Sequence, residues 1–393
     1  MIKTFYRWPF IAALSAIASV SSGTVDSEPL KSESNKFSPT FNVEGRINID
    51  ADHFDGIHID PNENQTKTQK KAELRRARLT FRASLNDNWS SKLQIAIDGN
   101  DDSYELKDAY IRYRGLDFTD IKIGQIKEPF SLESVTSSAN NAFIERSLLS
   151  PLSLGRSKGI NFANSNQQFS WSLGKYKVEK GGNIESDGDH AYTARVTYSP
   201  INNGNMYNHI GASFTKKKLL GAKYDLKSNG GVNSSIEFLN TSKTATDSIE
   251  QAGIEGAWGR GALSVQAEYQ HFKINAVDSQ EDSTYQGHYA QLSYFLTQDH
   301  RPYKKGRFAS VKPSSASGAW EIAFRYSALQ SIHVGNSDNS NMEIVSSTLA
   351  LNYYLNKRIK LMLNAVDIDT TGVALEGLPN TGEALSMRIQ LKL

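Results

Sequence analysis

The chain of 393 residues contains no cysteine, which excludes disulfide bonds and thiolate metal sites. Long apolar runs are also missing, because beyond the first residues no stretch approaches the ~20 apolar residues that a membrane-spanning helix needs. Hydrophobic residues make up 38% of the chain, which is low for a water-soluble globular domain. Tyr and Phe number 17 each, and many aromatics with few aliphatics suit an outer-membrane barrel with a wet interior.

Sequence signatures of catalysis and of metal binding are missing as well. The eight histidines are scattered, without a His-x-Glu or Gly-x-Ser-x-Gly context. No glycine motif that cradles phosphate is present. The Asp50-x-Asp52 start lacks Gly at the sixth position and Glu at the twelfth, so it does not match an EF-hand. We therefore predict no enzyme activity, no cofactor and no metal site.

The first residues are typical of a secretory signal peptide. Lys3 and Arg7 form a short basic region, and the apolar stretch 9–20 that follows is too short to span a bilayer. We predict that residues 1–23 are removed and that 24–393 form one outer-membrane domain. Removing Lys3 and Arg7 from the 44 basic residues leaves 42, equal to the 42 acidic residues. Any preference for anions must then come from where the charges lie.

Within this neutral chain, residues 72–85 have the clearest period of two. A β-strand points alternate side chains to opposite faces. One face would carry Arg76, Arg78, Thr80, Arg82 and Ser84, and the other Ala77, Leu79, Phe81, Ala83 and Leu85. In a water-soluble sandwich the apolar face would form the core, whereas in an outer-membrane barrel it would meet lipid and the arginines would line the lumen.

The same alternation predicts strands along the whole chain. They are expected at 41–50, 92–98, 108–114, 120–125, 169–173, 192–198, 263–269, 288–296, 319–326, 346–355, 358–365 and 384–393. A strand that runs to the last residue can close a barrel against the first strand. At ~20–25 residues for a strand and its connection, the chain gives about 16 strands. We predict an all-β fold, a transmembrane antiparallel β-barrel, because a soluble sandwich rarely has so many strands with a polar face of Arg, Gln and Ser.

Four segments interrupt this rhythm. Residues 127–159 are not strand-like, and we interpret them as a loop that folds inward and narrows the pore, because so long an irregular segment is usually functional. Lys216–Lys218 and Asn229–Gly231 are interpreted as turns. Residues 298–317 are basic and are interpreted as a solvated loop, with binding of lipopolysaccharide phosphates as the alternative. No helical periodicity is found, so no helix is expected.

Short motifs in a fixed order resemble the phosphate-selective porin O and P family. They include Glu73–Arg78, Glu105–Tyr110, Lys122–Phe130, Phe143–Arg146, Ile254–Trp258 and Gly318–Ile322, and they span nearly the whole chain after residue 23. The resemblance implies a 16-stranded barrel in the Gram-negative outer membrane, surrounded by its lipid. It also implies a homotrimer, small anions such as phosphate as solutes, and no nucleic-acid partner.

The resemblance also implies roles for single residues. Arg46, Arg75, Arg76 and Arg146 would line the pore, and Ser137 would donate a hydroxyl at the constriction. Departures from the family are Ser134 in place of a lysine in the inward loop, Lys107 in place of an aspartate, Asn42 in place of a basic residue, and Leu393 in place of a terminal aromatic. The resemblance therefore implies the pore architecture of the family for this chain, but it does not imply high selectivity for phosphate.

Alternation alone places more cations on the inward face. The candidates are Arg46, Arg76, Arg78, Arg82, Lys92, Arg112, Arg114, Lys122, Arg325, Lys360, Arg388 and Lys392. Guanidinium groups stay charged and present forked donors that match the oxygens of phosphate or carboxylate. Each arginine could instead pair with a cross-strand acid and brace the wall. Arg75 has the parity of the outward residues, so either a bulge turns it inward or it lies near the rim.

Two functions remain open from the sequence. The first is a water-filled, anion-leaning porin for passive uptake of phosphate or other small anions. The alternative is a plugged structural or adhesive barrel without channel activity. Single-channel conductance separates them, because a plugged barrel conducts nothing.

Overall fold

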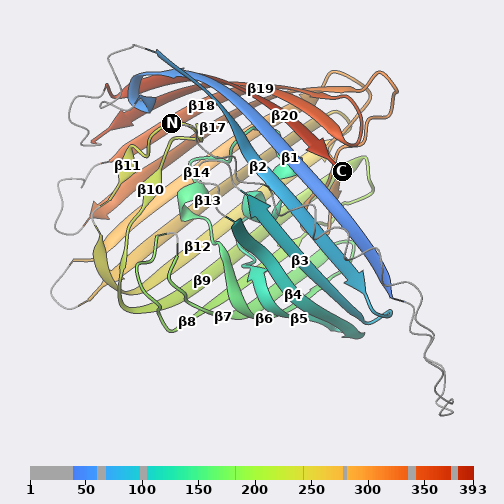
Figure 1. The fold of residues 1–393 in the computed structure, drawn as a ribbon, viewed down its shortest axis with the longest axis horizontal. Coiled ribbons are helices and arrows are strands. Elements are labelled where there is room, and N and C mark those ends of the chain that lie inside the picture. The colour runs from blue at the N-terminus through green and yellow to red at the C-terminus, as the bar shows by residue number, and fades with distance from the viewer. Residues whose placement is uncertain are drawn as a thin grey trace, which may run out of the picture. The chain divides into compact units, whose positions relative to one another are not determined.

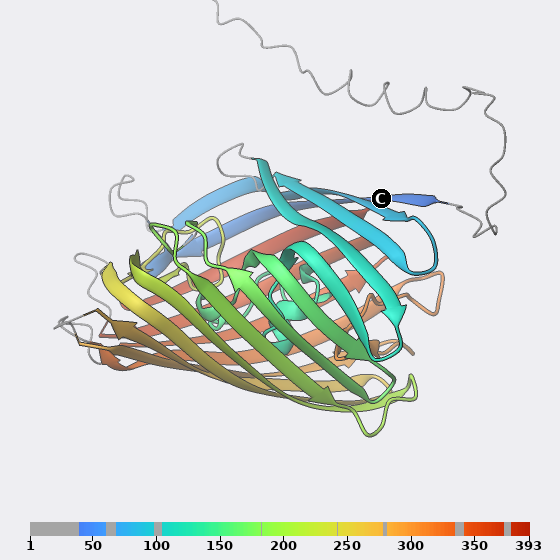
Figure 2. The same cartoon turned by 90° about the horizontal axis from the view of Figure 1, so that it is seen from below.

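Sixteen antiparallel strands form a closed barrel in the computed structural model (Figures 1 and 2). The structure describes residues 39–59, 68–97, 104–181, 183–241, 243–277, 281–334, 342–372 and 379–393, so the predicted signal peptide lies outside the described residues. In barrel order the strands are β1 (Thr40–Asp55), β2 (Thr68–Ser84), β3 (Trp89–Ile97), β4 (Tyr104–Leu116), β5 (Thr119–Lys127), β6 (Arg156–Ser165), β7 (Phe169–Lys177), β8 (His190–Tyr198), β9 (Met206–Tyr224), β12 (Thr244–Arg260), β13 (Leu263–Ala276), β14 (Ser283–Phe295), β17 (Ala319–Val334), β18 (Glu343–Tyr354), β19 (Ile359–Thr371) and β20 (Thr381–Lys392).

Shorter elements lie in the connections. They are η1 (Gly56–His58), α2 (Leu132–Val135), η2 (Ser138–Asn140), η3 (Ser150–Leu152), the pair β10 (Lys227–Ser228) and β11 (Leu239–Asn240), and the pair β15 (Tyr303–Lys304) and β16 (Arg307–Phe308). The prediction of no helix was thus wrong, because α2 is one turn of helix. A helix of this length is too short to produce a periodic apolar pattern in the sequence. None of the described helices is long and apolar enough to cross a membrane.

The last strand closes the barrel against the first, as the alternation at the C-terminus predicts. β20 pairs with β1 from Arg46 opposite Lys392 to Phe54 opposite Ala384. Beyond the ladder, the Leu393 amide donates to the Gly45 carbonyl at 2.9 Å. Closure leaves no unpaired strand edge, which a lipid environment would not tolerate.

Side chains alternate between the two faces of the barrel wall. On β20, Leu385, Met387 and Ile389 are about half exposed on the outside, whereas Ser386 and Arg388 are buried inside. The predicted assignment of apolar side chains to lipid and polar side chains to the lumen is therefore confirmed for this strand.

The two ends of the barrel differ in their connections. At one end the strands are joined mostly by short turns, such as 85–88, 117–118 and 261–262. At the other end the connections are longer, as in 128–155 and 225–243. Short turns face the periplasm in outer-membrane barrels, so the long loops face outward from the cell.

The interpretation of Lys216–Lys218 as a turn was wrong, since these residues lie inside β9. Lys217 points into the lumen, where its ammonium donates to Glu128 at 2.8 Å, and its two neighbours are exposed on the outside. Three consecutive lysines can continue a strand when the middle ammonium group reaches a carboxylate in the lumen and the two flanking ammonium groups extend to the outside of the barrel. The turn predicted at Asn229–Gly231 is present, with Gly230 and Gly231 at φ +64° and +89°.

Candidate functional site: the pore constriction

Residues 128–155 leave the wall after β5, fold into the lumen and rejoin the wall at β6; we call them the inward loop (Figure 2). They lie against the wall formed by β12 to β20, whose side chains donate to the loop's carbonyl groups. The donors and acceptors are Arg388 to Ile144 (2.6 Å), Asn352 to Ala142 (2.7 Å), Lys360 to Asn141 (2.7 Å), Gln390 to Ala139 (3.2 Å) and Gln251 to Leu152 (2.8 Å). These bonds satisfy backbone groups that the fold removes from water, so the loop has one defined position.

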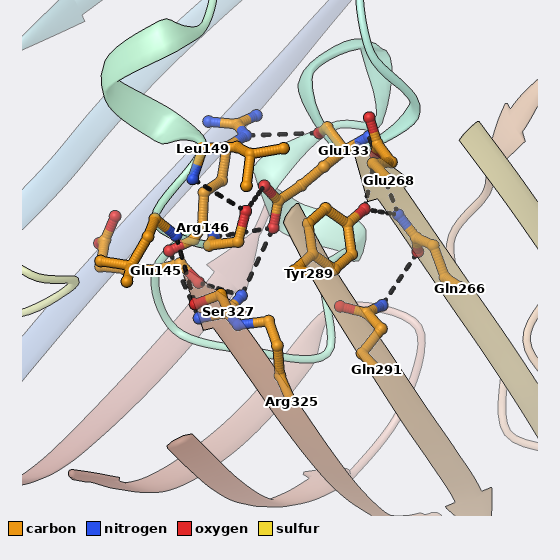
Figure 3. A network of polar contacts seen from close by, with 12 residues as sticks. Glu133, Glu145, Arg146, Leu149, Gln266, Glu268, Tyr289, Gln291, Arg325 and Ser327 are labelled. Atoms are coloured by element: carbon orange, nitrogen blue, oxygen red, sulfur yellow. Dashed lines mark hydrogen bonds and ion pairs between the residues drawn. The ribbon is translucent and has the colours of Figure 1, made fainter. Parts of the chain in front are cut away.

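Two glutamates fix the first turn of the inward loop (Figure 3). Glu268 on β13 accepts from the amides of Leu132 and Glu133 at 3.1 and 2.6 Å, where α2 begins. Carboxylates are favoured there because the first amides of a helix have no partner within it. Glu133 in turn accepts from the hydroxyl and the amide of Ser147 at 2.7 and 3.0 Å, which ties the start of the loop to its far side.

Glu145 joins the middle of the loop to the wall. Arg75 donates to it at 3.1 Å and Arg388 at 2.7 Å. Burial disfavours the charged carboxylate, but these two cations outweigh that effect and hold the pKa of Glu145 well below its usual range. Glu145 is therefore ionised under all ordinary conditions.

Arg75 points into the lumen because β2 carries a bulge. Asn48 of β1 lies opposite Arg76, and the next pair is Asp50 with Glu73, so Leu74 and Arg75 together face Ile49. The extra residue shifts the parity of the strand and turns Arg75 inward. Of the two alternatives left by the sequence, the bulge is the one the structure has.

Arginines of β1 and β2 converge beside η2 of the inward loop, next to the β20 side chains that hold the same segment. Arg46 and Arg76 donate to the hydroxyl oxygen of Ser138 at 3.2 and 3.1 Å. Arg46 lies opposite Arg78 in the ladder, and the charges of Arg78, Arg76 and Arg146 all act on it. We call Arg46, Arg76, Arg78 and Arg146 the arginine cluster. Like charges held this close favour the approach of an anion.

Arg146 enters this cluster from the inward loop. Its Nε and Nη2 donate to the carbonyls of Glu133 and Thr136 at 3.4 and 3.3 Å. The guanidinium is thus oriented by backbone oxygens, which carry no net charge. Its positive charge is positioned by these contacts without being neutralised by them.

Nearer the short turns, the cations of the same wall have carboxylate partners. Arg82 pairs with Glu44 at 3.0 Å, and Arg112 pairs with Asp120. Lys122 lies over the ring of Tyr110, 5.6 Å from its centroid. The wall therefore has a cluster rich in positive charge at the inward loop and a partly neutralised stretch below it.

A second segment enters the lumen from the short-turn end. Residues 296–318, which we call the lumen hairpin, contain β15 and β16. Arg301 donates to Glu321 at 2.8 Å and to the carbonyl of Asn140 in the inward loop at 2.7 Å. The Tyr303 hydroxyl lies 2.6 Å from Nδ1 of His209.

The interpretation of this segment as a solvated loop is right for Lys304, Lys305, Arg307 and Lys312, which are exposed, and wrong for Arg301, which is only 4% exposed. The polar sequence of the segment predicted exposure to solvent, but the polar partners of Arg301 include a residue of the barrel wall. The alternative role in binding lipopolysaccharide phosphates does not fit the position of the segment, which joins β14 to β17 at the short-turn, periplasmic end.

Comparison with known proteins identifies the family. Residues 41–393 match the family described as phosphate-selective porin O and P. The chain belongs to this family. It is 26% identical to Porin O of Pseudomonas aeruginosa over 395 residues, which cover 89% of this chain and 88% of that protein. It is also 24% identical to an uncharacterized protein of Caulobacter vibrioides, over 74% of this chain and 61% of that protein.

Solved structures with the same fold are also porins and channels. The anion-selective porin from Comamonas acidovorans superposes with a TM-score of 0.59 at 12% identity, covering 91% of this chain and all of that one. The outer membrane channel DcaP of Acinetobacter baumannii gives 0.57 at 12% identity, over 93% and 100%. At such identities the likeness shows the fold alone. With the family, it makes this chain an anion channel of the Gram-negative outer membrane and not an enzyme.

The family resemblance singles out two serines of the porin's inward loop, and the structure gives their contacts. The Ser137 side chain is exposed and accepts from the Ala139 amide at 3.4 Å, whereas the arginines contact Ser138. Ser134 is buried, and the Lys127 ammonium donates to its carbonyl. A cation therefore lies close to the place where a lysine of the loop was expected. An irregular loop has no period, so the sequence could not tell one serine from the next.

Proposed function

We propose that this porin passes small anions, phosphate among them, by weak binding at the arginine cluster and without strong selectivity for phosphate. The observation that carries the proposal is that Arg46 and Arg76 direct guanidinium groups at one neutral hydroxyl, Ser138. An anion placed there would accept charge-assisted hydrogen bonds and relieve the repulsion among the cations.

Release is supported by the next cations along the wall. Arg82 and Arg112 already pair with Glu44 and Asp120, so an anion that moves toward the short turns competes with a carboxylate at each step. Sites that weaken along the path let an ion enter the pore and still leave it. Weak selectivity is supported by Ser134, which brings no charge of its own to the loop.

An open path is also supported at the long-loop end. A cavity of about 700 Å³ is lined by the inward loop, including Glu145 and Arg146, and by Lys217 of β9 and Lys227 of β10. An anion could enter this cavity and reach Arg146 directly. The plugged barrel remains the second candidate, because both the inward loop and the lumen hairpin occupy the lumen.

Assembly and processing belong to the same proposal. The porin would be a homotrimer in outer-membrane lipid, with residues 1–23 removed and 24–393 forming the barrel domain. OmpT of Vibrio cholerae, which has been solved in a trimer form, shares the fold with a TM-score of 0.53 at 8% identity. That likeness supports the architecture from which such trimers are built.

Planar-bilayer recordings test the proposed channel. Single insertions should produce discrete conductance steps, and zero-current potentials in gradients of potassium chloride and potassium phosphate should both indicate anion preference. Absence of steps from a correctly folded barrel would favour the plugged alternative. A cation-selective potential in dilute salt would overturn the role given to the arginine cluster.

A further inference from the structure

The exterior of β6 to β9 changes from apolar to basic within one row of side chains. In the ladder, Leu173 lies opposite Ala194, and Ala194 opposite Phe214, which makes an apolar row. One row nearer the long loops, Lys175 lies opposite Tyr192, and Tyr192 opposite Lys216. Directly opposed residues share a face of the sheet, so these lysines point away from the lumen.

Further lysines extend this row into a band. Lys177 lies opposite His190 at the top of β7, and the Asp189 amide donates to the Lys218 carbonyl at 2.9 Å. Lys158 on β6 is 61% exposed. The lysine band consists of Lys158 on β6, Lys175 and Lys177 on β7, and Lys216 and Lys218 on β9, all exposed on the outside of the barrel.

Some of these cations have carboxylate partners and others do not. Lys158 pairs with Glu179 at 2.9 Å and Lys216 with Glu250 at 2.6 Å, while Lys177 lies 3.7 and 3.6 Å from Glu179 and Asp187. Within the described part of the chain, neither Lys175 nor Lys218 has a carboxylate oxygen within 4.0 Å, and the acid whose charge acts on both is the exposed Asp189. The Lys175 ammonium instead lies 5.5 Å from the centroid of the Tyr192 ring.

The same border is acidic on the other side of the barrel. On the outside of β19 and β20, Asp367 lies directly opposite Glu383, and Asp369 lies opposite Thr381. Positive charge at this level is therefore a property of β6 to β9 and not of the whole rim. A local patch of one sign indicates a local partner of the opposite sign.

We propose that the lysine band binds the phosphate groups of a phosphorylated glycolipid in the outer leaflet of the outer membrane. The band lies where the apolar belt ends, which is the level of lipid headgroups. Lysine stems can lie along the apolar row while the ammonium groups extend to the headgroups. Leu173 and Phe214 offer an apolar surface to the acyl chains directly below. This site lies outside the pore, so it does not depend on the proposed conduction mechanism.

The test measures lipid retained by the full-length protein purified in detergent. Native mass spectrometry is recorded with bis-phosphorylated lipid A, with the same lipid after removal of its phosphates, and with inorganic phosphate as competitor. Wild type should hold the phosphorylated lipid, and K175Q/K218Q should bind it more weakly by on the order of tenfold. K357Q/R358Q, which changes two exposed cations at the short-turn end, should bind as wild type does.

Three outcomes would overturn the proposal. One is equal retention of the lipid with and without phosphates. Another is equal retention by wild type and K175Q/K218Q. The third is displacement of the lipid by millimolar inorganic phosphate, which would make a free anion the ligand. If the double variant does not fold, the single variants K175Q and K218Q are measured instead. Zero-current potentials of the folded variants should match wild type, since neither lysine faces the pore.

Discussion

At the scale of single residues, the proposed function assigns the ion preference of this porin to the arginine cluster. Arg76 and Arg78 are two residues apart on one face of β2, so their positions lie about 7 Å apart along the wall. Replacing both with glutamate should reverse the local potential, because lumen substitutions change selectivity more than folding. Zero-current potentials of R76E/R78E should shift toward cation preference. The control K175E/K218E reverses equal charge on the outside of β7 and β9, away from the lumen. A folded R76E/R78E with wild-type selectivity would mean that these arginines only brace the wall.

The contact made by Ser138 gives a second test at this scale. S138A removes the shared acceptor of Arg46 and Arg76, so the two guanidinium groups lose a fixed orientation. Block of chloride current by phosphate should weaken by about 2- to 10-fold, the net value of one hydrogen bond. S137A is the matched control and should block as wild type does. If S137A weakened the block and S138A did not, Ser137 would be the hydroxyl donor at the constriction, as the family resemblance implies.

At the scale of elements, the bulge in β2 determines where Arg75 points. Deleting Leu74 removes the extra residue, so Arg75 should face Ile49 on the lipid side of the wall. A charge there costs about 2–4 kcal/mol near the middle of the bilayer. The folded fraction in detergent, read from heat-modifiable migration, should fall for the deletion. It should recover when R75A is added, and no recovery would mean that the bulge serves another purpose.

The position of the inward loop depends on the charge of Glu145. The pKa of this carboxyl is held below its ordinary value, so its contribution to anchoring is fully present above about pH 4.3 and is lost only as the pH falls through the lower, folded pKa. The difference in open-channel noise between wild type and E145Q should therefore be the same at pH 7 and pH 5. E145Q should be noisier at both, because Arg75 and Arg388 lose their charged partner. A wild type that becomes as noisy as E145Q at pH 5, while the two differ at pH 7, would contradict an ionised Glu145 anchor.

At the scale of the whole molecule, selectivity rests on the placement of charge, since acidic and basic residues nearly balance. Anion preference should then be strong in dilute salt and weaker at 1 M, where the screening length falls to ~3 Å from ~10 Å at 0.1 M. The measurement is the zero-current potential across a fixed salt ratio at both concentrations. A preference that does not change with salt would indicate a steric filter instead.

The sequence by itself determined the barrel, because a strand's two faces follow from a local period that each segment carries. Alternation located most strands, the closing strand at 384–393 and the inward face of Arg46, Arg76 and Arg82. It failed at Lys216–Lys218, where a run of like residues hides the period.

Only the tertiary structure decided where the irregular segments go. Three features depend on partners that lie far away in the chain. They are the bulge that turns Arg75 inward, the contact of the arginines with Ser138 instead of Ser137, and the burial of Arg301. Those partners become neighbours only when the barrel closes, since β20 pairs with β1 across the whole length of the sequence. The constriction therefore forms only when the barrel closes. The strands that carry its arginines can be predicted from the alternation of side chains in the sequence.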